Sequence, residues 1–272
     1  MSGQFWTVAG VAVLAGATAV GLWTAPGAEP PRPPQSEARV SAAVSDAFDG
    51  ETREALHTEI RAYLLSNPEI VMEMVGLIEA RQQADAQAAE IDMVRNNADA
   101  LFNDGFSYVG GNPEGDVTIV EFIDYQCGFC KRAHDEVVTL VEQDGNIRYI
   151  VKELPILGPM SMTAAQATLS VLENDGPDVY KEFNDALMRF GGRLNDQIID
   201  RLAERSGADV AAMREDMDGR EVERQIAEIR TLAGALNISG TPTFVIGDTV
   251  VRGYMPLPRM QETVELVRRV GQ

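Results

Sequence analysis

The sequence of 272 residues contains two cysteines, Cys127 and Cys130, in the tetrapeptide Cys-Gly-Phe-Cys. Two thiols at this spacing can hold a metal ion, form a structural disulfide, or alternate between dithiol and disulfide. Tetrahedral zinc needs four ligands, yet there is no third cysteine, and His57 and His134 are the only histidines. A structural disulfide that spans two residues constrains almost none of the unfolded chain. The motif therefore favours a redox pair, with His134 as the nearest further ligand if a metal were bound.

The elements predicted around the two cysteines place Cys127 at the start of a helix. Residues 117–123 predict an apolar strand, the segment after Cys130 has apolar residues at helical spacing, and residues 147–155 predict another strand. At the start of a helix, free amide groups and the helix dipole stabilise a thiolate and lower its pKa. We therefore expect Cys127 to be the exposed nucleophile. We expect Cys130, one turn further on, to be the shielded thiol that resolves a mixed disulfide.

One charged residue, Glu121, interrupts the apolar strand before the first cysteine. We expect its carboxylate to be partly buried near Cys130, where burial raises the pKa and allows the group to relay a proton. The alternative is a partly solvated carboxylate at a sheet edge. Lys152 on the next predicted strand is expected to neutralise it. Asp124 is expected to be an ordinary loop acid, and His134 a residue of the helix surface.

A second candidate segment, Gly240-Thr241-Pro242, stands directly before a predicted hairpin. Residues 243–246 and 249–252 predict two strands that are joined by a turn at residues 247–248. Proline is tolerated at the start of a strand, and the bond before proline is the one at which a cis geometry costs little. A turn proline is common by itself, so this signal gains its weight from the cysteine pair.

These motifs resemble the DsbA-type branch of the thioredoxin superfamily. The resemblance rests on VEFIDYQCGFCK, VKELPILGP and SGTPTFVIG within residues 105–272, and on YLLSNPEIVMEMVGLIEARQ, which is similar to the N-terminal region of bacterial ScsC and Com-type relatives. It implies an α/β, thioredoxin-like fold with a DsbA-type helical insertion at about residues 158–237, which would cover the face that carries the cysteines. It also implies that Pro242 is a cis-proline beside them, and that the main chain of Thr241 pairs with an extended substrate segment.

The resemblance implies a thiol–disulfide oxidoreductase of the periplasm of a Gram-negative bacterium, which acts on exported proteins and has a membrane redox partner. The expected redox group is the Cys127–Cys130 disulfide itself, with no other cofactor and no metal. The direction of exchange stays open. The strongly oxidising members have Pro-His between the cysteines, whereas Gly-Phe, with Thr241 before the proline, is closer to bacterial disulfide isomerases. Isomerase or reductase activity is therefore an alternative, and a copper- or zinc-handling module or a holdase are further ones.

The N-terminal segment predicts export. Residues 5–25 carry no charge and are numerous enough to cross a bilayer as a helix. Residues 1–28 fit either a cleaved signal peptide or an uncleaved membrane anchor, and a Pro-rich linker follows over residues 29–40. Both interpretations place the rest of the chain in an oxidising compartment, where disulfide chemistry is at home.

Residues 41–104 predict a helical region with an apolar stripe, in which Asn67 and Pro68 indicate the N-cap and the first residue of a helix. Such a stripe packs either on the downstream domain or on another copy of the chain, so a homo-oligomer through residues 41–104 is one expectation. The formal net charge of −19 argues against nucleic acid as a partner, because phosphate binding needs a basic surface.

Overall fold

The computed structural model of the chain describes residues 49–270. The chain divides into two compact units, one up to Met74 and one from Val75 onward. The segments predicted as signal or anchor (residues 1–28) and as linker (residues 29–40) lie outside the described residues. Among residues 49–270, no helix combines the length and the apolar character that crossing a membrane requires.

The first unit contains helix α2, Gly50–Ser66, and the start of helix α3, Pro68–Asn96. Helix α2 is capped by Asp49, whose carboxylate accepts a hydrogen bond from the Thr52 amide at 2.8 Å. Helix α3 begins at Pro68, as predicted. Asn67, predicted as the N-cap, directly precedes α3, and its side-chain amide donates at 2.8 Å to the carbonyl of Tyr63 in the last turn of α2, of which it is the C-cap.

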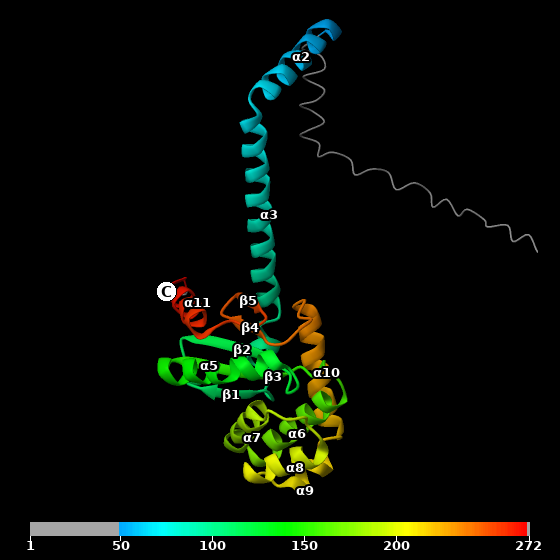
Figure 1. The fold of residues 1–272 in the computed structure, drawn as a ribbon, viewed down its shortest axis with the longest axis vertical. Helices are drawn as coiled ribbons and strands as arrows, with labels where there is room; N and C mark the ends of the chain where they lie inside the picture. The colour runs from blue at the N-terminus through cyan, green and yellow to red at the C-terminus, as the bar shows by residue number, and fades with distance from the viewer. Residues whose placement is uncertain (1–48, 271–272) are drawn as a thin grey trace, which may run out of the picture. The chain divides into compact units, whose positions relative to one another are not determined.

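The second unit contains a five-stranded mixed sheet in the order β1-β3-β2-β4-β5 (Figure 1). The strands are β1 Tyr108–Gly111, β2 Val117–Ile123, β3 Ile147–Glu153, β4 Thr243–Ile246 and β5 Thr249–Arg252. Strands β2 and β3 are parallel and are joined by helix α5, Gly128–Asp144, whereas the other neighbours are antiparallel. The β-α-β unit and the terminal hairpin are those that the sequence predicts.

Helices cover both faces of this sheet because its central strands are apolar on both sides. Along β2, Ile119 packs toward α5 and α11 (Leu257–Val270), whereas Val120 packs toward α10 (Arg220–Ala235) and α4 (Ala98–Phe102). Side chains alternate between the two faces of a strand, so neighbours in sequence enter different cores. The face on which each residue of β2 and β3 lies therefore decides whether it can reach the cysteines.

The segment between β3 and β4 is helical, as the sequence predicts. Its helices are α6 Pro159–Asp175, α7 Pro177–Arg189, α8 Asp196–Arg205, α9 Val210–Asp216 and α10. Tyr180 and Phe183 of α7 join Ile123 and Tyr125 in one core cluster, which also contains both cysteines. In Figure 1, α6 to α9 gather below the edge strand β1. The shared core cluster shows that the insertion packs against the segment that joins β2 to the cysteine pair.

Candidate active site

Cys127 is the N-cap residue of α5. Its Sγ accepts a hydrogen bond from the backbone amide of Cys130 at 3.4 Å. The pKa of Cys127 is lowered to about 5, chiefly by a hydrogen bond from the Cys130 side chain and further by the backbone amides of Cys130 and Phe129, although burial opposes the shift. A helix that begins at this residue therefore supplies the donors that a thiolate needs.

Cys130 has the opposite electrostatic environment. It is completely buried, and burial, its hydrogen bond to Cys127 and the charge of Glu121 together raise its pKa above the ordinary value. Both cysteines are free thiols in this structure. At neutral pH the pair thus consists of a thiolate at Cys127 and a thiol at Cys130.

The prediction that Cys127 is exposed is wrong, because only 6% of the residue is accessible. Its Sγ lies 3.1 Å from the carbonyl oxygen of Thr241, so the chain before β4 covers it. The neighbouring Phe129, in contrast, is 61% exposed. The sulfur therefore lies just below a rim that solvent reaches.

Pro242 follows Thr241 through a cis peptide bond. Strand β4 pairs with β2 so that Thr243 lies opposite Phe122. This register places the residues before β4 beside the end of β2, which the cysteine motif follows. The sheet therefore brings Thr241 and Pro242 next to Cys127 although they are more than a hundred residues away along the chain.

Glu121 lies in the middle of β2 and is 2% exposed, so the expected burial is observed. Burial raises its pKa to about 7, and the charge of Cys127 adds to the shift, whereas a hydrogen bond from the Tyr149 hydroxyl opposes it. The same carboxylate raises the pKa of Cys130. Glu121 is therefore a titratable group near neutral pH that interacts electrostatically with both sulfurs.

The prediction that Lys152 neutralises Glu121 is wrong. Lys152 is fully buried, and its Nζ donates to Asp104 Oδ2 at 2.7 Å and to Ser107 Oγ at 3.3 Å. The reason is the alternation of side chains along β3. Tyr149 lies on the same face of the sheet as Glu121, and Lys152 is three residues further along β3, so its side chain lies on the opposite face. The partner of Glu121 is therefore a phenol and not an ammonium group.

The expectations for His134 and Asp124 are also wrong. His134 is buried, and its Nε2 lies 2.8 Å from Asp185 Oδ1 of α7, because the helical insertion covers that side of α5. Asp124 is buried, and its Oδ2 accepts hydrogen bonds from the amides of Ile156 and Leu157 at 2.8 and 3.0 Å. Asp124 thus fixes the loop after β3 beside the cysteine motif.

A second buried carboxylate, Glu153, was not predicted. Its Oε1 accepts hydrogen bonds from the hydroxyls of Tyr180 at 2.6 Å, Tyr125 at 2.8 Å and Thr168 at 3.1 Å. Burial raises its pKa to about 7, and its Oε2 has no hydrogen-bond partner among the described residues. The alternation along β3 could have placed Glu153 on the same face as Tyr149, but its partners come from distant segments.

The described part of the chain contains no group of three or more His, Cys, Asp or Glu side chains that could hold a metal ion. Within this part, the arrangement that the structure brings together is a thiolate, a buried thiol, a buried carboxyl group and the carbonyl of Thr241. These groups can exchange a disulfide and move the accompanying proton.

Family models match two parts of the chain. The model described as thioredoxin matches residues 103–265, and the model described as the N-terminal domain of copper resistance protein ScsC matches residues 53–85. The first match covers the sheet, the cysteine pair and the helical insertion. The second falls on α2 and the first part of α3.

Solved structures of similar proteins agree with these matches. A thioredoxin-like oxidoreductase from Silicibacter pomeroyi DSS-3 is 42% identical, with a TM-score of 0.60 over 63% of this chain and 97% of that chain. The catalytic domain of Proteus mirabilis ScsC is 27% identical, with a TM-score of 0.61 over 66% and 98%. The thiol-disulfide exchange protein alpha-DsbA2 from Wolbachia pipientis is 28% identical, with a TM-score of 0.63 over 67% and 98%.

Two curated proteins differ in how much of their length is matched. The Na(+)/H(+) antiporter NhaA 3 of Salinispora tropica is 30% identical over 141 residues, which are 51% of this chain and 21% of the antiporter. Disulfide bond formation protein D of Bacillus subtilis is 24% identical over 165 residues, 57% of this chain and 74% of that protein. The chain thus spans about a fifth of the antiporter's length.

Proposed function

The chain belongs to the thioredoxin family and is a thiol–disulfide oxidoreductase of the DsbA and ScsC type, and from this premise we propose that Cys127 and Cys130 are its redox pair. The substrates in this proposal are thiols and disulfides of exported proteins. The observation that carries the proposal is the asymmetry of the two sulfurs. Cys127 has a pKa of about 5 at the start of α5, whereas Cys130 is buried and resists ionisation.

The asymmetry defines the order of events in the reducing direction. The Cys127 thiolate attacks one sulfur of a client disulfide, and the client's other sulfur leaves as a thiolate. The sulfur of Cys130 then attacks Cys127 in the mixed disulfide and gives its proton to Glu121. The bond to the client breaks, the client leaves as its second thiolate, and the Cys127–Cys130 disulfide forms. Oxidation of a client is the same sequence in reverse, with Glu121 returning the proton to Cys130.

The pKa of Cys127 supports an oxidising couple. A thiolate that is stabilised in the reduced protein makes the disulfide form a stronger oxidant. The value of about 5 lies between about 7 for thioredoxin and about 3.5 for DsbA. We therefore place the oxidase direction first, and a disulfide isomerase or reductase in an oligomer is the alternative.

The surface beside Cys127 fits an extended client segment. The main chain of Thr241 touches the sulfur, so a client strand that pairs with this backbone would present its own sulfur to Cys127. Three large apolar side chains are exposed nearby: Phe129 in the motif, and Ile156 and Leu157 in the loop that Asp124 holds. Apolar residues of a partly unfolded client can bury these side chains.

Replacing Cys130 by alanine tests this function, because the mixed disulfide with a client can then no longer be resolved. Covalent client complexes should accumulate through Cys127 when the variant is expressed with its exported clients, and a reducing agent should release them. The matched control is the double variant Cys127→Ala/Cys130→Ala, which should trap nothing. If the single variant traps no client, the redox pair does not act on proteins.

Export and self-association complete the proposal. We place the protein in the periplasm of a Gram-negative bacterium with a membrane redox partner, and residues 1–28 act as signal or anchor, because their apolar run fits export. For self-association, the exposed apolar side chains of α2 and α3 supply the surface: Leu56, Ile60, Tyr63, Leu65, Val71, Met72, Met74, Val75, Leu77 and Ile78.

Light scattering tests the self-association. The full chain should have a mass that is a multiple of its 29.6 kDa, and Ile60→Glu/Leu77→Glu should reduce it to one copy, because a charge on each helix opposes the burial of these apolar side chains. The matched control is Glu59→Gln/Glu79→Gln on the same helices, which should keep the wild-type mass. A monomeric wild-type chain contradicts this part of the proposal and leaves the redox chemistry untouched.

A further inference from the structure

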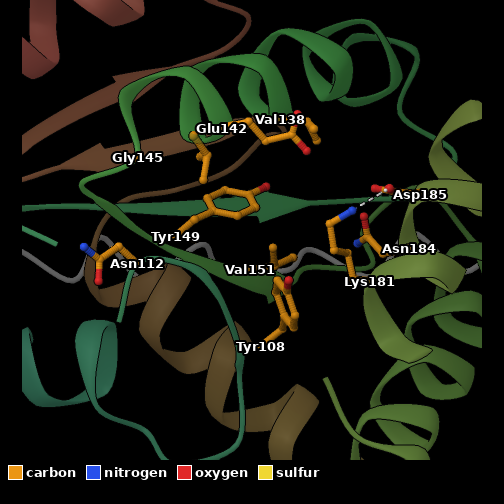
Figure 2. Close-up of a pocket in the computed structure, with 12 residues that line it drawn as sticks. Tyr108, Asn112, Val138, Glu142, Gly145, Tyr149, Val151, Lys181, Asn184 and Asp185 are labelled. Carbon is orange, nitrogen blue, oxygen red and sulfur yellow. Dashed lines mark hydrogen bonds and ion pairs between the residues drawn. The ribbon is translucent and has the colours of Figure 1, made fainter. Parts of the chain in front are cut away.

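A cavity of about 300 Å³ lies between the sheet, α5 and α7 (Figure 2). Tyr108, Tyr149 and Val151 line it from β1 and β3, and Val138 and Glu142 line it from α5. Its lining also includes exposed residues such as Gly111, Glu142 and Gly145, so the cavity opens to solvent. The steps of thiol–disulfide exchange proposed above do not involve this cavity.

Tyr149 connects the cavity to the redox site. Its side chain lines the cavity, and its hydroxyl donates a hydrogen bond to Glu121 Oε2 on the neighbouring strand. Among the described residues, no other group hydrogen-bonds to the Glu121 carboxylate. Because Glu121 itself is 2% exposed, its carboxylate has almost no direct contact with solvent.

Other charged and titratable groups surround the contact between Tyr149 and Glu121. At the start of α5, the sulfurs of Cys127 and Cys130 interact electrostatically with Glu121. Burial and the charge of Glu121 raise the pKa of Tyr149 well above its ordinary value, and the neighbouring phenols are Tyr108 of β1 and Tyr125 of the loop after β2. Around the cavity, Asp185 of α7 is bound by Lys181 and by His134 of α5, and Glu142 lies at the exposed rim. Lys152 and Asp104 pair with each other on the other side of the sheet.

We propose that Tyr149 positions the Glu121 carboxylate and passes its proton to solvent in this cavity. The proposal rests on the function proposed above. After Glu121 has taken the proton of the Cys130 thiol, the carboxyl group gives a proton to the phenol oxygen of Tyr149. The phenol releases its own proton to water in the cavity. Tyr149 ends unchanged, and the carboxylate is ready for the next cycle.

The expected effect follows from the hydrogen bond that Tyr149 donates. This bond favours the ionised carboxylate, and the pKa of about 7 leaves about half of Glu121 ionised at pH 7. Removing a hydrogen bond to a charged group raises such a pKa by about one unit, which leaves about one tenth ionised. In Tyr149→Phe, the step at Cys130 should therefore slow about fivefold at pH 7, and its pH midpoint should rise by about one unit.

A chromogenic nitrobenzoate disulfide separates the two sulfurs in one experiment on the reduced full chain. Attack by Cys127 releases one coloured thiolate, and attack by Cys130 on the resulting mixed disulfide releases a second. In stopped-flow traces across pH, Tyr149→Phe should leave the first phase unchanged and should shift the second. The matched control is Tyr108→Phe, which removes a hydroxyl from the same cavity but no hydrogen bond to Glu121, and its second phase should equal that of the wild type.

Two further variants separate the parts of the proposal. Glu121→Gln should slow the second phase and remove its pH dependence near neutrality. Val138→Phe should slow the second phase without moving its midpoint, because the larger ring fills part of the cavity and hinders exchange with solvent. Circular dichroism and thermal melting of each variant report whether the fold is kept.

The outcomes distinguish failure of this inference from failure of the function. If a folded Tyr149→Phe variant keeps the wild-type pH profile of the second phase, Tyr149 does not act on Glu121. If Tyr108→Phe shifts the profile equally, the assignment to Tyr149 is wrong. An unchanged second phase in Val138→Phe contradicts the route through the cavity. A wild-type chain that releases only one thiolate contradicts the proposed function itself.

Discussion

Changing Cys130 tests why the Cys127 thiol is acidic. The pKa of Cys127 falls from 9.0 to about 5, and this difference of about four units corresponds to about 5 kcal/mol in favour of the thiolate. The first cause is the hydrogen bond from the Cys130 thiol, and the backbone amides of Cys130 and Phe129 add to it. A hydrogen bond to a charged group is worth roughly 1.5–3 kcal/mol, which is about one to two pKa units.

Cys130→Ala removes this donor but keeps the backbone amides, so the pKa of Cys127 should rise to about 6–7. Cys130→Ser is the matched variant, since its hydroxyl can still donate, and its Cys127 should stay closer to the wild-type value. The measurement is a pH titration of the ultraviolet absorbance of the thiolate. The rate of alkylation at each pH gives an independent value.

Two results would refute this reasoning. A Cys127 pKa above 8 in the reduced wild-type protein would show that the start of α5 does not stabilise the thiolate. A pKa that is equal in the wild type and in Cys130→Ala would show that the backbone amides, and not the second thiol, carry the effect.

The remaining predictions concern stability. The pKa of Glu153 is 4.5 in its ordinary state and about 7 when folded, so the folded chain binds more protons between these values and its stability falls as pH rises through them. Glu153→Gln should therefore reduce the difference in unfolding free energy between pH 5 and pH 7 by about 2 kcal/mol in urea titrations, and an unchanged difference would contradict the raised pKa. Lys152→Met leaves Asp104 without its buried cation and should cost about 3–5 kcal/mol, whereas Arg95→Met, which breaks the exposed pair with Asp248, should cost less than about 1 kcal/mol. Equal costs in the same titrations would show that burial of the Lys152 pair does not matter.

The sequence predicts the elements around the site well because their signals are local. The largely apolar run of β2, the turn between β4 and β5 and the helical spacing after Cys130 each depend on neighbouring residues. The bounds 117–123, 243–246 and 249–252 agree with the structure. The cysteine motif then indicates where a helix must begin.

The partners of the buried groups could not be predicted in the same way. Glu121 pairs with Val151, so Lys152 is one residue from this position and Tyr149 is two, yet Lys152 is on the other face and meets Asp104. The burial of His134 depends on α7, which is about fifty residues further along the chain. Such contacts depend on how the insertion packs, and a single sequence gives no measure of that packing.

The reduction potential of the Cys127–Cys130 couple tests the central claim most directly. Equilibration of the full chain with glutathione buffers, followed by quantification of both thiols, gives this value. The low pKa of Cys127 predicts a reversible two-electron couple with a potential between roughly −200 mV and that of DsbA, about −120 mV. This range lies above the potential of thioredoxin, about −270 mV. A potential at or below that of thioredoxin would contradict the oxidising couple, and the absence of a reversible couple would contradict the redox pair itself.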